Sequence, residues 1–201
     1  DEILLALAEL GELADRTVLL GQTKFFGDHL GWPDWLTHGT SFEGRPHSDI
    51  PNCITLRDDL LIHANIIDVG IADEMVALLA GEERLPGSPS TALVLMTEPT
   101  LGETLRRFSG KLVTDNPEML TELMVQDGLL RFRVGYRVRL GKVGDYISTL
   151  VHIMLKQLIK AIAPGAMLEL SLEIVPALSP LPPAIPGALD EEAETVSDTG
   201  S

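Results

Sequence analysis

LLRFRVGYRVRL, residues 129–140, alternates apolar and polar side chains along almost its whole length. Successive side chains of a β-strand point to opposite faces, so the pattern puts one kind of residue on each face. The apolar face holds Leu130, Phe132, Val134, Tyr136, Val138 and Leu140. The other face holds Arg131, Arg133, Arg137 and Arg139, with Gly135 among them. The stretch therefore predicts a half-buried strand of an antiparallel sheet.

A partner for this strand comes just before it in the chain. The dipeptide Asp-Gly at 127–128 separates two alternating runs and favours a two-residue hairpin turn. Pairing across that turn sets Leu123 opposite Phe132 and Glu122 opposite Arg133, so the apolar faces coincide and opposite charges meet. The same register pairs Val125 with Leu130, Thr121 with Val134, and Met124 with Arg131.

Periodicity along the rest of the chain predicts an α+β fold, with helices packed on one face of a small antiparallel sheet of three or four strands. Thr100 and Glu103 have the spacing of a capping box, and Gly70 is expected to break a helical pattern. Helices are expected at 3–14, 56–80, 101–113 and 145–163, with Asp145 as the last helix's N-cap, and further strands at 91–97 and 167–175. Residues 15–54 are expected to be the least regular part, with a short helix starting at Pro33.

Length and composition favour one domain followed by a tail. The chain has 201 residues, 45% of them apolar, and the net charge is −15. We expect a domain at 1–175 and a Pro-rich acidic linker or disordered tail at 176–201. A charge this negative argues against direct binding of nucleic acid over a broad surface. The first residue is Asp1, which suggests a processed N-terminus or a piece of a longer chain.

The compartment is expected to be the cytoplasm. The single cysteine, Cys53, excludes an internal disulfide and fits a reducing environment. Acidic residues at positions 1 and 2 do not fit a signal peptide. The most apolar segment, 147–162, contains His152 and Lys156, which is typical of a buried helix face and not of a membrane span.

Motifs for catalysis or metal binding are weak. His29, His38 and His47 are spaced by nine residues and followed by Cys53, but this spacing matches no zinc pattern. The sequence contains no Gly-x-Ser-x-Gly elbow and no phosphate-binding glycine loop. We therefore expect no enzyme, no metal and no cofactor, and a small metal-dependent enzyme is the least favoured alternative.

Two groups of residues are candidates for ligand binding. Trp32, Trp35 and Phe42, with His38, either line an apolar pocket or form a local core in a loop-rich segment, and the sequence favours neither. The arginine face either forms ion pairs with acids such as Glu122 or binds an anionic ligand or an acidic partner. The ion-pair interpretation is preferred because acidic partners exist in the sequence. The candidate ligand-binding residues are Trp32, Trp35, His38, Phe42, Arg133 and Tyr136.

The run MTEPTLGETLRRFSGKL at 96–112, followed by the Asp-Gly hairpin and a Leu-rich helix, resembles a known family. It is similar to the N-terminal, arabinose-binding-like effector domain of bacterial transcription regulators of the AraC/XylS type. Those domains carry a T-L-G-E-A-L-R-R helix, and the matching residues here are Thr100, Leu101, Gly102, Glu103, Leu105, Arg106 and Arg107. The resemblance covers roughly 56–175, and no ligand-binding residue can be transferred through it.

The resemblance implies a ligand-sensing domain that binds a small-molecule effector, forms a homodimer and regulates transcription. The pair of helix-turn-helix motifs that reads DNA in the family is not found in this sequence. The expected function is therefore a sensor domain without direct nucleic-acid binding and without a membrane partner. The alternative is a protein–protein interaction module that uses the arginine strand.

Overall fold

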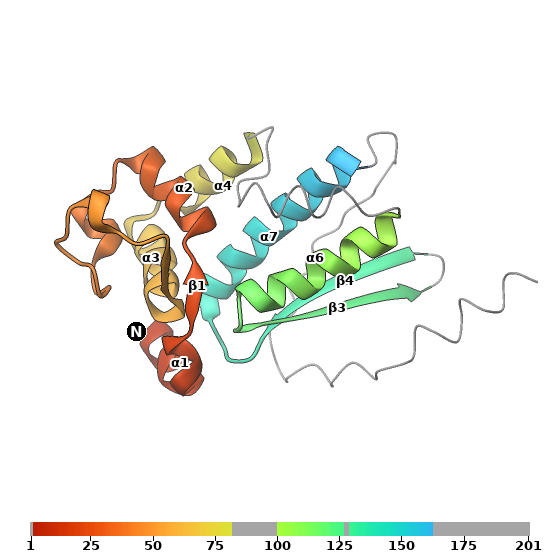
Figure 1. Cartoon of the computed structure of the whole chain (residues 1–201), viewed down its shortest axis with the longest axis horizontal. Coiled ribbons are helices and arrows are strands. Elements are labelled where there is room, and N and C mark those ends of the chain that lie inside the picture. Colours follow the sequence, from red (N-terminus) through yellow and green to blue (C-terminus); the bar gives the residue numbers. More distant parts are fainter. Residues whose placement is uncertain (1, 82–99, 127–128, 163–201) are drawn as a thin grey trace, which may run out of the picture.

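The computed structural model describes residues 2–81, 100–126 and 129–162, and these form an α+β fold (Figure 1). The described ranges contain six α-helices and two antiparallel sheets of two strands each. The elements are α1 (Glu2–Leu10), η1 (Gly11–Asp15), β1 (Thr17–Leu19), α2 (Gly21–Leu30), η2 (Asp34–Thr37), η3 (His47–Asp49), β2 (Cys53–Thr55), α3 (Leu56–Val69), α4 (Ala72–Gly81), α6 (Leu101–Asp115), β3 (Met119–Gln126), β4 (Leu129–Tyr136) and α7 (Gly141–Ile162).

The β3–β4 hairpin has the register that the alternating sequence predicts. Leu123 pairs with Phe132 and Glu122 with Arg133, whose Nη1 donates to the Glu122 carboxylate at 3.2 Å. Helix α6 covers one face of the hairpin, where Phe108 meets Phe132 with ring centroids 5.9 Å apart. The expected strands at 91–97 and 167–175 lie outside the described residues, and so do the turn at 127–128 and the tail at 176–201.

Helix boundaries follow the capping residues in two of the predicted places. The helical pattern at 56–80 is divided at Gly70, which ends α3 in the left-handed conformation with φ 84°. The Thr100 hydroxyl accepts from the backbone N–H of Glu103 at 3.2 Å, as a capping box requires. The carboxylate of Glu103 accepts from the Thr100 hydroxyl at 2.6 Å, whereas the full motif would use the Thr100 N–H.

Helix α7 starts earlier than the sequence predicts. Asp145 was expected as the N-cap, but α7 begins at Gly141 and continues through Gly144. A Cβ at Gly144 would lie 3.3 Å from the Tyr136 ring and 3.1 Å from the Cβ of Leu140. Glycine therefore allows the close approach of α7 to the end of β4. Its low helix propensity makes the segment look like a loop in sequence.

The segment 15–54 is more regular than expected. It forms α2 and a two-stranded ribbon in which β1 pairs with β2, setting Val18 opposite Ile54. Pairing between strands so short and so distant in sequence leaves almost no periodic signal. Pro33 is the N-cap of η2, so this short helix begins at Asp34, one residue after the predicted start at Pro33.

Helix α3 is the centre of the N-terminal part. It contacts α1, α2, the β1–β2 ribbon and α7 (Figure 1). Its buried face includes Leu60, Ile62 and Ile66, each fully inaccessible to solvent. Within the described ranges, no helix is both long enough and apolar enough to cross a bilayer.

The C-terminal end of α2 is closed by Trp32, which lies over Gly27. Trp32 has a positive φ of 51°, donates its backbone N–H to the Gly27 carbonyl at 2.9 Å, and donates its indole N–H to Asp28 at 2.8 Å. A Cβ at Gly27 would overlap the Trp32 indole ring. Trp32 therefore has a clear structural role at this position.

We predict that Gly27→Ala destabilises the protein by about 1–3 kcal/mol, because the added methyl group must displace the indole. Gly21→Ala in the same helix is the matched control, since a Cβ there meets nothing within 4 Å. It should leave the stability unchanged or raise it by up to about 1 kcal/mol. Urea unfolding followed by tryptophan fluorescence measures both, and equal stability of the two variants would contradict this packing.

Candidate functional site

Polar side chains are buried on α3, on α7 and on the connection between α6 and β3. His63 is 3% exposed, Tyr146 6% and Glu118 1%. Asp59 lies beside His63, and together we call these four residues the buried polar cluster. Burying polar groups costs free energy unless they find partners, so each member needs a physical account.

Asp59 and His63 lie one turn apart on α3 and face the same neighbours. The carboxylate of Asp59 accepts a hydrogen bond from the Thr23 hydroxyl of α2, and its second oxygen is 3.7 Å from His63 Nε2. Burial lowers the pKa of His63 below its ordinary value, and the Asp59 carboxylate opposes that shift. The imidazole is therefore neutral at neutral pH. It meets the Tyr146 ring edge-on, with centroids 5.6 Å apart.

Glu118 joins the cluster from the connection between α6 and β3. Burial raises the pKa of its carboxyl to about 8; its own backbone N–H lowers the pKa, and the Asp59 carboxylate raises it further. The segment is held by Arg137, which donates its backbone N–H to the Glu118 carbonyl and its Nε to the Pro117 carbonyl, both at 2.8 Å. At neutral pH the Glu118 carboxyl is mostly protonated, so it can donate a hydrogen bond.

Three polar atoms of the cluster have no hydrogen-bond partner within the described part of the chain. They are His63 Nδ1, Glu118 Oε2 and the Tyr146 hydroxyl. Tyr136, on the neighbouring strand, differs because its hydroxyl donates to the Gly144 carbonyl at 3.0 Å and bonds the Ser148 hydroxyl at 2.9 Å. Burial also raises the pKa of both tyrosines. The cluster thus offers donors and acceptors that no other described residue uses.

This chemistry is suited to holding a small polar molecule. A protonated carboxyl, a phenol and a neutral imidazole can donate and accept hydrogen bonds in several combinations. In the described ranges, no three His, Cys, Asp or Glu side chains are arranged to hold a metal ion. His29, His38, His47 and Cys53 are all exposed.

The predicted aromatic candidates lie in the segment that follows α2. Phe42 is 2% exposed, Trp32 and Trp35 are partly buried, and His38 is exposed. Trp32 packs on Gly27, as described above. Phe42 belongs to the hydrophobic core, and Trp32 and Trp35 pack against it. These contacts support a local core for the segment, and a ligand-binding role for its aromatic residues stays a prediction.

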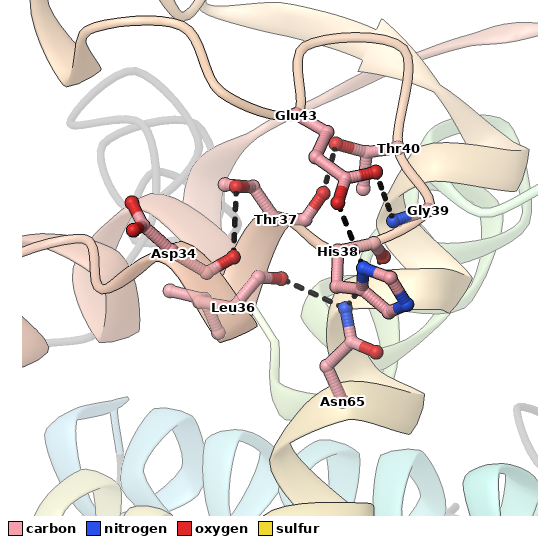
Figure 2. A network of polar contacts seen from close by, with 8 residues as sticks. All are labelled: Asp34, Leu36, Thr37, His38, Gly39, Thr40, Glu43 and Asn65. Atoms are coloured by element: carbon pink, nitrogen blue, oxygen red, sulfur yellow. Dashed lines mark hydrogen bonds and ion pairs between the residues drawn. The ribbon is translucent and has the colours of Figure 1, made fainter.

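Figure 2 shows how this segment is tied to α3. The side-chain amide of Asn65 donates to the Leu36 carbonyl at 3.0 Å and to the His38 carbonyl at 2.9 Å. The Glu43 carboxylate accepts from the Gly39 N–H at 3.0 Å and bonds His38 Nδ1 at 2.7 Å. The His38 ring therefore helps to close its own loop.

The other two candidates, Arg133 and Tyr136, lie on β4. Figure 1 shows the β3–β4 hairpin and the loop that follows α2 on different sides of the molecule. The hydrogen bonds of Arg133 and Tyr136 are to Glu122, Gly144 and Ser148, and none of these residues lies in that loop. Arg133 is paired with Glu122, which supports the ion-pair interpretation at this position. Tyr136 anchors α7 through the bonds described above.

Sequence reasoning missed the buried polar cluster. In the sequence, Asp59 is an acidic residue in the first turn of a predicted helix and Tyr146 belongs to the apolar face of another, and neither position indicates a site. The i, i+4 spacing of Asp59 and His63 on a predicted helix was an available signal. Glu118 has no recognisable signal in the sequence, because its burial depends on contacts between elements far apart in the chain.

We predict that stability falls as the pH rises from about 6.5 to 8, because the folded protein still holds the Glu118 proton that the unfolded chain has released. Its pKa is raised in the folded state from 4.5 to about 8, so in this window the folded protein binds more protons than the unfolded chain. The free energy of unfolding should fall by up to about 1.4 kcal/mol per pH unit. His63, with its lowered pKa, removes stability only at more acidic pH.

Urea unfolding across this pH range, compared between the wild type and Glu118→Gln, measures the effect. The neutral amide should flatten the profile, whereas Glu12→Gln, an equal charge change at an exposed position, should leave it as in the wild type. An unaltered slope in Glu118→Gln would show that another group is responsible.

Comparisons with known proteins identify no relative. No family model, no curated protein and no solved structure matches this chain.

Proposed function

We propose that this chain is the ligand-sensing regulatory domain of a transcription regulator of the AraC/XylS type, and that its effector is a small polar molecule bound at the buried polar cluster. One observation carries the proposal. His63 Nδ1, Glu118 Oε2 and the Tyr146 hydroxyl are buried and lack protein partners in the described ranges. A polar ligand that satisfies these atoms would remove the cost of burying them.

The position of the cluster suits a sensor. His63 belongs to α3, whereas Glu118 precedes the hairpin and Tyr146 belongs to α7. A ligand bonded to all three elements favours the arrangement in which they are close together. Its binding free energy then biases the hairpin and α7 relative to the N-terminal helices.

The resemblance to the regulator family supports the same proposal. The Thr100–Arg107 pattern coincides with the capped start of α6, and α6 packs on the hairpin as one unit. The proposal includes a homodimer, a cytoplasmic location in a bacterium, and no direct contact of this chain with nucleic acid. The net charge of −15 is in keeping with the last of these.

Two tyrosine variants test the proposal with opposite expected outcomes. Tyr146→Phe removes a hydroxyl that has no partner among the described residues, so the unfolding free energy should stay constant or rise, while binding of the effector weakens about tenfold. Tyr136→Phe removes a hydroxyl with two protein partners, so stability should fall by about 1 kcal/mol while effector binding is kept.

Effectors are sought by thermal shift with a panel of sugars, amino acids and small aromatic acids, followed by calorimetry on the hits. Analytical ultracentrifugation measures the oligomeric state. If no compound stabilises the protein and the chain is strictly monomeric, the proposal is wrong.

A protein–protein interaction module is the second candidate, favoured by two arginines of the hairpin region. Arg131 and Arg139 are exposed and form no hydrogen bond or ion pair with the described residues, unlike Arg133 and Arg137. An acidic partner would find these two cations available.

In this case Arg131→Glu with Arg139→Glu should abolish binding to acidic peptides at low ionic strength and preserve folding. Arg133→Glu, which sets two carboxylates opposite each other on the hairpin, should lower stability by about 0.5–1 kcal/mol. Circular dichroism and fluorescence anisotropy separate these effects. Unchanged peptide binding in the double variant would exclude this candidate.

A further inference from the structure

A surface hollow lies between the β1–β2 ribbon, the loop that carries Phe42, and the first turn of α3. Its volume is about 170 Å³, and its lining includes Thr17, Phe42, Arg45, Cys53, Ile54 and Asp58. The hollow is separate from the buried polar cluster. Asp58 faces the hollow and Ser41, whereas the next residue, Asp59, faces Thr23 and His63.

The wall of the hollow contains the buried carboxylate of Asp58. Asp58 is 2% exposed, and its two carboxylate oxygens accept from the backbone N–H and the hydroxyl of Ser41, at 2.9 and 2.7 Å. Each carboxylate oxygen can accept a second hydrogen bond. Asp58 is the only acidic residue among those that line the hollow.

The Arg45 side chain lies at the edge of the same hollow and carries a positive charge. Arg45 is exposed, and its guanidinium forms no hydrogen bond or ion pair with the described residues. The planar group has five N–H donors and is suited to a carboxylate. Phe42 and Ile54, both buried in the core, add an apolar wall.

We propose that this hollow binds a small zwitterion, of the class of free amino acids with short side chains. The ammonium group bonds the Asp58 carboxylate, the carboxylate group bonds the Arg45 guanidinium, and the side chain packs on Phe42 and Ile54. A molecule with a single charge pairs with one of the two residues and leaves the other unmatched. A cavity of about 150 Å³ can hold benzene, so the volume suits a ligand of this size.

Cys53 supplies a direct reporter because it is exposed, lines the hollow, and is the only cysteine in the sequence. The experiment measures the rate at which N-ethylmaleimide modifies the folded chain near neutral pH. Glycine, L-alanine and L-valine are the zwitterionic probes. Isovalerate and isobutylamine are the controls, since each keeps the branched side chain of valine with one charged group only.

We expect at least one amino acid to slow the labelling of Cys53, and the singly charged controls to bind about tenfold or more weakly. Arg45→Met should remove this protection without changing stability, because the guanidinium bonds none of the described residues. Arg106→Met, at an exposed position on α6, should keep it. Calorimetry with the same probes gives the affinities.

Three results would overturn this inference: no protection by any of the three amino acids, equal protection by the singly charged controls, or full protection in Arg45→Met. The inference does not depend on the proposed sensor function. Tyr146→Phe should leave the protection of Cys53 unchanged, so failure at one site is distinguishable from failure at the other.

Discussion

The N-terminal part of the structure depends on the polar bonds made by the first turns of α3. The Thr55 hydroxyl caps the helix, and Asp58 and Asp59 reach out to different neighbours. Consecutive helical residues point about 100° apart, so Asp58 holds the loop through Ser41 while Asp59 bonds Thr23 of α2. Two loosely patterned segments are thereby attached to one well-formed helix. Further along α3, the Asn65 amide holds the same loop through the Leu36 and His38 carbonyls.

Burying the side chains of Asp59, His63 and Glu118 would cost free energy if all three were charged, and two of the three are neutral. A buried charge needs compensation, and two carboxylates close together cannot both ionise cheaply. Asp59 has a hydroxyl donor in Thr23, whereas Glu118 keeps its proton, as its raised pKa of about 8 shows. His63 stays neutral because desolvation outweighs the attraction of Asp59. The result is a single negative charge surrounded by neutral groups with spare hydrogen-bonding capacity.

Patterns of neighbouring residues in the sequence predict those elements of the fold that neighbouring residues determine. The hairpin register follows from period-two alternation and a turn dipeptide, and the end of α3 from Gly70, because neighbouring residues determine both. The start of α7 is not predictable in this way, since Gly144 is explained by the Tyr136 ring of another element. The β1–β2 ribbon and the burial of Glu118 likewise arise only when distant segments meet. The two candidate sites are not predictable from the sequence either, because each is formed by segments that are far apart in the chain.

The two sites lie on either side of one helical turn, and this arrangement has a consequence for regulation. The hollow uses Asp58 and the cluster uses Asp59, so an occupant of the hollow acts on the turn that also sets the position of Asp59. Asp59 in turn raises the pKa of Glu118 and contacts His63. Any effect of a ligand in the hollow on the cluster must be matched by an equal effect of the cluster on that ligand, because coupling free energies are reciprocal. Under the two proposals, such coupling passes through Asp58 and Asp59, which are adjacent in α3.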